Sequence, residues 1–128
     1  MDAQHWRDTL KLLCIMILAD EKVYEEEVDS FKKAAVALRD SINPKLMLTE
    51  HMAEEWFIVH RDEIKIEMSS LYHENITEKL LENLKALPER KILLMALMKI
   101  ALSDGHKASE ENAMLKRASI CWDLEMTG

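Results

Sequence analysis

The sequence predicts an all-α protein, and three observations carry this prediction. Glycine and proline occur only twice each in 128 residues, whereas strand-rich proteins need many turns. The chain is 48% hydrophobic and rich in Leu, Ala, Glu, Lys and Met, most of which are strong helix formers. Apolar residues recur at intervals of three and four along most of the chain. We therefore expect one compact domain over residues 1–128, a bundle of about six to seven helices.

The N-terminal third of the chain predicts a helical hairpin. The first helix ends at Asp20, and a short loop leads to the second helix at the acidic run Glu25 to Glu27, whose negative charge suits the positive end of a helix dipole. The apolar stripe of the first helix is Trp6, Leu10, Leu13, Cys14, Ile17 and Leu18. That of the second is Val28, Phe31, Ala35 and Leu38.

The middle of the chain predicts further helices with less regular spacing. Asn43-Pro44 indicates a boundary, and we expect a new helix to start there because proline suits a first helical turn. Over 46–72 the apolar spacing slips near 60–62, which favours two helices in series over one kinked helix. Asn75 or Thr77 then caps a short helix whose apolar residues are Leu80, Leu81, Leu84 and Leu87.

Two helices complete the expected fold. The segment from Pro88 to Gly105 is apolar on more of its circumference than any other, so we expect it to be the most buried helix, with Gly105 as its C-terminal cap. Leu94 and Leu97 should then lie in the core. The last helix begins near Ser109, and its apolar residues are Met114, Leu115, Ala118, Cys121 and Trp122.

The two ends of the chain repeat one pattern. A shift of 84 positions places Leu10, Leu13, Leu18, Asp20, Glu26, Glu27, Lys32 and Ala34 on Leu94, Leu97, Leu102, Asp104, Glu110, Glu111, Lys116 and Ala118. Each copy is a hairpin in which an Asp ends the first helix and a Glu opens the second. We expect the two pseudo-repeated hairpins to pack side by side, related by a pseudo-twofold, with four carboxylates brought toward one region.

The repeated motif, an apolar helix followed by A/S-D-G, five residues, Glu and an amphipathic helix, resembles the TerB-like tellurite-resistance family. SDGHKASEE matches the second copy of that motif, and ADEKVYEEE matches the first except for Glu21 in place of Gly. The resemblance covers nearly the whole chain and implies a compact helical bundle. It also implies a cytosolic, non-enzymatic protein linked to tellurite and other chemical stress. A metal-binding acidic surface, carried over to this sequence, consists of Asp20, Glu27, Asp104 and Glu111.

The chemistry of these four residues favours one class of metal. Carboxylate ligands alone suit Ca²⁺ or Mg²⁺ better than zinc or copper. A self-sufficient calcium loop of the EF-hand type is excluded, because its first two ligand positions would be the apolar Ile100 and Leu102. A cation would therefore be shared between the hairpins or completed by water. In the alternative interpretation the carboxylates cap helices, with Lys22, His106 and Lys107 between them, and bind no metal.

Charge, hydropathy and cysteine content exclude several classes of function. The net charge of −7 argues against a nucleic-acid partner, and the first apolar run is too short and too interrupted to cross a membrane. Two cysteines without close spacing indicate reduced thiols and a cytoplasmic location. No catalytic nucleophile or phosphate-binding loop is apparent, so we expect no enzymatic activity.

Two smaller groups of residues have a simple structural interpretation. His51 with Glu55 and His60 with Glu63 are expected to be surface pairs, since each pair spans about one helical turn. Met16, Met95, Met98 and Met114 are expected to fill the core.

The sequence is compatible with two functions. The first is a TerB-like stress-response protein that binds a divalent cation and acts through protein partners. The second is a helical interaction scaffold with an apolar groove and no metal site.

Overall fold

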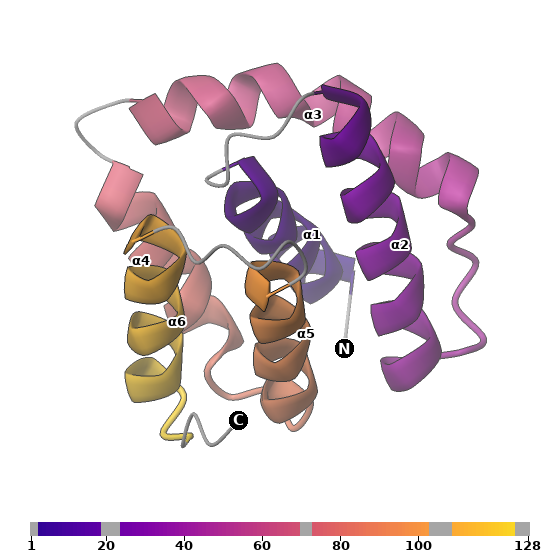
Figure 1. Cartoon of the computed structure of the whole chain (residues 1–128). Coiled ribbons are helices and arrows are strands. Elements are labelled where there is room, and N and C mark those ends of the chain that lie inside the picture. The colour runs from indigo at the N-terminus through magenta and orange to yellow at the C-terminus, as the bar shows by residue number, and fades with distance from the viewer. Residues whose placement is uncertain (1–2, 19–23, 70–72, 103–108, 125–128) are drawn as a thin grey trace.

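The computed structural model describes residues 3–18, 24–69, 73–102 and 109–124, and its regular elements are all α-helices. They are α1 (Ala3–Leu18), α2 (Tyr24–Ile42), α3 (Glu50–Ser69), α4 (His73–Leu84), α5 (Arg90–Leu102) and α6 (Ser109–Cys121). Figure 1 shows α3 lying across one end of the molecule, with α2, α5 and α6 extending away from it. The all-α prediction is confirmed.

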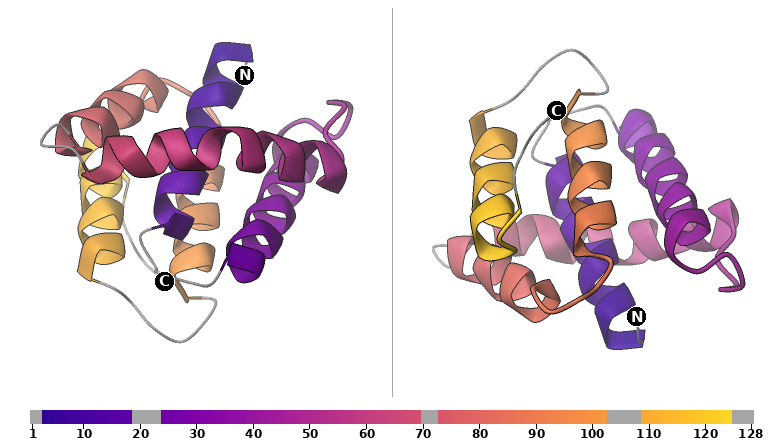
Figure 2. Two further views of the ribbon diagram at one scale, coloured as in Figure 1. Left: turned by 90° about the horizontal axis from the view of Figure 1, so that it is seen from above. Right: turned by 90° about the horizontal axis from the view of Figure 1, so that it is seen from below.

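Helix α1 forms the centre of the bundle. It contacts α2, α3, α4 and α5, and every side chain from Leu12 to Leu18 is buried. Figure 2 shows α3 crossing over α1 in the left panel and α1 passing behind α5 in the right panel. The prediction that α5 is the most buried helix is wrong, since α5 leaves Ile92 and Met95 exposed. An apolar circumference does not reveal which helix has neighbours on every side.

The predicted apolar stripes form the core. All residues of the stripes in α1 and α2 are buried, and Leu94 and Leu97 of α5 are buried as well. The leucines that the repeat pairs, Leu10 with Leu94 and Leu13 with Leu97, are thus all core residues. A pseudo-twofold between the hairpins stays a prediction. Met16 fills the core as expected, but Met95 does not, because its side chain is 61% exposed.

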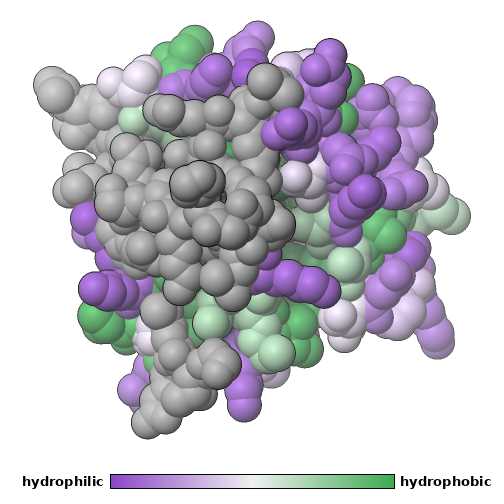
Figure 3. All heavy atoms as spheres, viewed as in Figure 1, coloured by the Kyte–Doolittle hydropathy of each residue, from purple (hydrophilic) through white to green (hydrophobic). Residues whose placement is uncertain are grey.

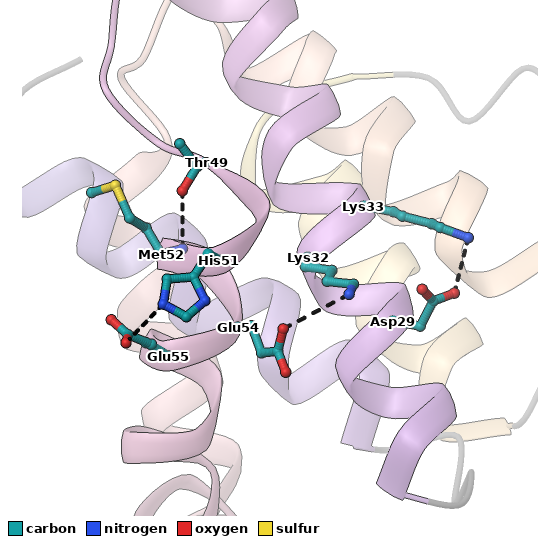
Figure 4. A network of polar contacts seen from close by, with 8 residues as sticks. All are labelled: Asp29, Lys32, Lys33, Thr49, His51, Met52, Glu54 and Glu55. Carbon is teal, nitrogen blue, oxygen red and sulfur yellow. Dashed lines mark hydrogen bonds and ion pairs between the residues drawn. The ribbon is translucent and has the colours of Figure 1, made fainter.

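The start of α3 differs from the prediction. The boundary after α2 is correct, but α3 begins at Glu50, not near Pro44. The backbone N–H of Met52 donates to Oγ1 of Thr49 at 3.1 Å (Figure 4), so Thr49 is the N-cap of this helix. Arg39 of α2 donates to the carbonyl of Leu46 at 3.4 Å and holds the connection between the helices. A side-chain cap, not the proline, sets where α3 begins.

Helix α3 is one continuous helix, so the favoured division into two is wrong. The apolar spacing slips because Val59 faces solvent while Arg61, a charged residue, faces the interior. Phe57 and Ile64 keep the buried face on either side of the slip.

Helices α4 to α6 close the bundle around α1. Leu80, Leu81 and Leu84 of α4 are buried as predicted, although α4 begins at His73, before the expected caps. The indole N–H of Trp122 donates to the carbonyl of Leu81 at 2.8 Å, which ties the end of α6 to α4. Arg90 donates to the carbonyl of Trp122 at 3.1 Å. The expected cap Gly105 and the side chain of Met114 lie outside the described residues.

Replacing Leu97 with Ala tests this core. Leu97 is completely buried, so the change should lower the free energy of unfolding by about 2–5 kcal/mol, measured by urea denaturation. The matched control is Ile120→Ala, because Ile120 is 81% exposed on α6 and its truncation should change stability by no more than about 0.5 kcal/mol. A loss below about 1 kcal/mol for Leu97→Ala would place α5 at the periphery.

Candidate cation site and the polar cluster beside it

The four carboxylates of the predicted cation site are described to different extents. Asp20 and Asp104 lie outside the described residues. Glu111 belongs to the first turn of α6, but its side chain is also outside the description. Only the side chain of Glu27, in the first turn of α2, is placed. Whether the four carboxylates converge therefore stays a prediction.

The helix ends that flank the two acidic segments do share one side of the molecule. Residues 19–23 separate the end of α1 from the start of α2, and residues 103–108 separate the end of α5 from the start of α6. In Figure 1 these four helix ends are on the side nearest the viewer. Figure 2 agrees, with all four toward the bottom of the left panel and the top of the right panel.

Glu27 forms a buried ion pair with Arg61 of α3. Glu27 is only 2% exposed, and its Oε1 atom accepts a hydrogen bond from Nε of Arg61 at 3.0 Å and lies 2.9 Å from Nη2 in the ion pair. The guanidinium group also lies 5.1 Å from the ring centroid of Tyr24 and donates through Nη1 to Asp62 at 3.2 Å. A planar guanidinium with several fixed donors suits such a site. The pair joins the first turn of α2 to the middle of α3.

The charges of this ion pair affect the pKa of Cys14 in α1. Burial above all, and then the negative charge of Glu27, raise the pKa of the Cys14 thiol to about 12, although the positive charge of Arg61 acts in the opposite direction. Burial also raises the pKa of Cys121, and Glu82 adds to that effect. Both cysteines are free, as expected. At neutral pH both are therefore protonated thiols, which are poor nucleophiles and poor metal ligands.

Sequence reasoning missed Arg61 as the partner of Glu27. The two residues are 34 positions apart, so no local spacing connects them. The signal that could have found Arg61 is the slip in apolar spacing near 60–62, where a basic residue takes an inward position. Lys22, His106 and Lys107, the cationic neighbours considered from sequence, lie outside the described residues.

The other acidic and histidine groups offer no metal centre within the described part of the chain. No cluster of three or more His, Cys, Asp or Glu residues there could hold a metal ion. His51 and Glu55 form the expected surface pair at 3.1 Å, and both side chains are exposed. His60 instead stacks on Trp56, with ring centroids 4.3 Å apart.

A groove of about 1040 Å³ lies between α2 and α5. Its wall is apolar where the small side chains of Ala34, Ala37 and Ala96 leave room between the two helices. Charged residues from both helices border it, among them Glu26 and Lys99. Apolar concave surfaces with a few polar groups are typical ligand and peptide sites.

In the described part of the chain, helices α2 to α5 pack around a buried α1 and α6 packs on α4 and α5, which defines an all-α helical-bundle protein. Over residues 7–125 the chain matches the family model described as tellurite resistance protein TerB, so it belongs to that family. No curated protein and no solved structure gives a significant match. Among the described residues, none of the helices combines the length and apolar character that crossing a bilayer requires.

Breaking the buried ion pair should be costly. Arg61→Met leaves the Glu27 carboxylate buried without its guanidinium, so the free energy of unfolding should fall by about 3–5 kcal/mol in urea denaturation at pH 7. Lys33→Met is the matched control, because it removes an exposed 3.0 Å pair with Asp29 and should cost less than about 1 kcal/mol. Equal losses in the two variants would show that the Glu27–Arg61 pair behaves like a surface pair.

Proposed function

We propose that this TerB-family protein is a non-enzymatic, cytoplasmic component of the response to tellurite and related chemical stress. In this proposal it binds a divalent cation at the acidic segments and acts through protein partners. Membership of the TerB family supports the tellurite link. The free cysteines fit a reducing compartment.

The cation proposal rests on one observation: the helix ends that flank the two acidic segments all lie on the same side of the molecule. Helices α1 and α5 contact each other, and the ends that flank both acidic segments face the same way. Carboxylates gathered at one place repel each other unless a cation or a basic group compensates them. Asp20, Asp104 and Glu111 would supply oxygen ligands, and Ca²⁺ or Mg²⁺ would supply the compensating charge.

Glu27 fits this site with one restriction. Its Oε1 atom already contacts two nitrogen atoms of Arg61, so a cation at Glu27 would share the carboxylate with a guanidinium or displace it. The positive charge of Arg61 opposes a second cation nearby. Glu27 therefore serves as a bridge between the cation site and α3, with Asp20, Asp104 and Glu111 as the primary ligands.

The alternative function is a helical protein-interaction scaffold without a metal site. The groove between α2 and α5 supports it, because the groove joins an apolar wall to charged borders. In that case the acidic residues serve solubility and helix capping, and Glu27 serves only the ion pair with Arg61.

A thermal melt of the double variant Asp104→Asn, Glu111→Gln distinguishes the two functions. With Ca²⁺ or Mg²⁺ at about 100 times its dissociation constant, the parent protein should gain roughly 2.7 kcal/mol relative to chelator. The double variant should lose that gain, because it lacks two ligand charges.

The control is Glu78→Gln, which removes an exposed carboxylate of α4 and should keep the full response to metal. A parent midpoint that does not move in millimolar Ca²⁺, Mg²⁺ or Mn²⁺ would rule out the cation site at those concentrations. A double variant that is more stable than the parent in chelator and indifferent to metal would favour the scaffold function, because it would show unrelieved repulsion.

A further inference from the structure

Helix α3 has an outer face that no described element covers. The left panel of Figure 2 looks directly onto this helix, which crosses in front of the rest of the molecule. Three apolar residues lie along the face, namely Met52, Val59 and Ile66, and Val59 and Ile66 are 72% and 70% exposed. Their spacing of seven residues is close to two helical turns, so the three side chains lie near one line along the helix. We name these three residues the α3 stripe.

Acidic side chains border the α3 stripe on both sides. Glu55 and Asp62 follow its first two residues by three positions, and Glu63 follows Val59 by four, so all three are on the same or adjacent faces of the helix. All three are exposed. His51 pairs with Glu55 at the start of the stripe (Figure 4).

Nearby basic residues neutralise only part of the negative charge beside the α3 stripe. Arg61 reaches Asp62 through one nitrogen, but its other two contacts go inward to Glu27. Lys65 is exposed, yet it lies about 100° around the helix from Ile66. The border of the α3 stripe is therefore dominated by carboxylates.

We propose that the α3 stripe binds an amphipathic helix of a partner protein, whose apolar residues recur with the heptad spacing and are flanked by Lys and Arg. The apolar line matches such a helix in register, and the carboxylates match its basic flanks in charge. The net charge of −7 would also attract a basic partner over a longer range.

Other occupants fit less well. A second copy of this chain would bring Glu55, Asp62 and Glu63 against the same carboxylates, which disfavours a symmetric dimer through this face. An anionic membrane would meet the same repulsion. The partner is thus a basic protein helix, and the inference does not depend on the cation site.

The test uses a designed probe, because the partner is identified only by its chemistry. The probe is a fluorescent helical peptide of about 21 residues, or three heptads, with Leu at the first and fourth positions and Lys or Arg at the flanking positions. Its counterpart has Glu at every flanking position. Fluorescence anisotropy in chelator, which keeps the cation site out of the measurement, should show binding of the basic peptide. The acidic peptide should bind at least about tenfold more weakly.

Variants of the full chain locate the binding. Val59→Ser with Ile66→Ser should weaken binding of the basic peptide at least about tenfold. Ile120→Ser, which removes an exposed apolar residue of α6, should leave the affinity unchanged. Glu55→Gln with Asp62→Asn should weaken binding and reduce its salt dependence, whereas Glu78→Gln on α4 should do neither. Circular dichroism checks that each variant keeps the parent's helix content.

Four results would overturn the proposal. They are no binding of the basic peptide, equal binding of both peptides, an equal loss in Ile120→Ser, and self-association through α3. Sedimentation of Val59→Ser with Ile66→Ser beside the parent tests the last, since a dimer through the α3 stripe would dissociate in that variant. Binding of the parent to anionic vesicles that is lost in the same variant would assign the face to a membrane instead.

Discussion

The burial of α1 is the constraint on which the rest of the structure depends. From Leu12 to Leu18 its side chains are buried on all sides of the helix, so no single neighbour can cover it. Helices α2, α3, α4 and α5 all contact it. Each fully buried large apolar side chain contributes about 1.5–3 kcal/mol relative to exposure, so these seven residues form a large part of the driving force for folding. Helix α6 packs on α4 and α5 and completes the outer layer.

This arrangement also explains the position of the polar groups. Because α2 and α3 both pack on α1, the start of α2 contacts the middle of α3. Glu27 and Arg61 form their ion pair at this contact. A buried carboxylate without such a partner would be strongly destabilising. The same packing of α1 against α5 orients the helix ends beside both acidic segments toward one side of the molecule. Figure 3, which has the same viewpoint as Figure 1, shows hydrophilic residues over much of the right-hand side of the molecule.

Local sequence patterns predicted most of the fold. The stripes through Leu13 and Phe31 identified buried faces correctly, because helical spacing reports burial directly. Tertiary context decided the rest. Apolar composition favoured α5 over α1 as the central helix, but α5 has α1, α2 and α6 as neighbours and leaves Met95 61% exposed.

The candidate site was harder to predict than the fold. The repeat identified Glu27 as a residue of interest, but not its partner, since the Glu27–Arg61 contact depends on how α2 and α3 pack. The start of α3 was misplaced for a related reason. Pro44 can begin a helix, but the hydroxyl of Thr49 satisfies a backbone N–H of the first turn, and the helix starts there.

Native-state hydrogen exchange of the backbone amides tests the central position of α1 most directly. Amides buried in the most enclosed element exchange only through global unfolding, whereas peripheral helices open locally. We expect the amides from Leu12 to Leu18 to be the slowest of the chain, with opening free energies equal to the global free energy of unfolding. Amides in α1 that exchange faster than those of α5 would contradict the account, because α5 would then be the centre of the bundle.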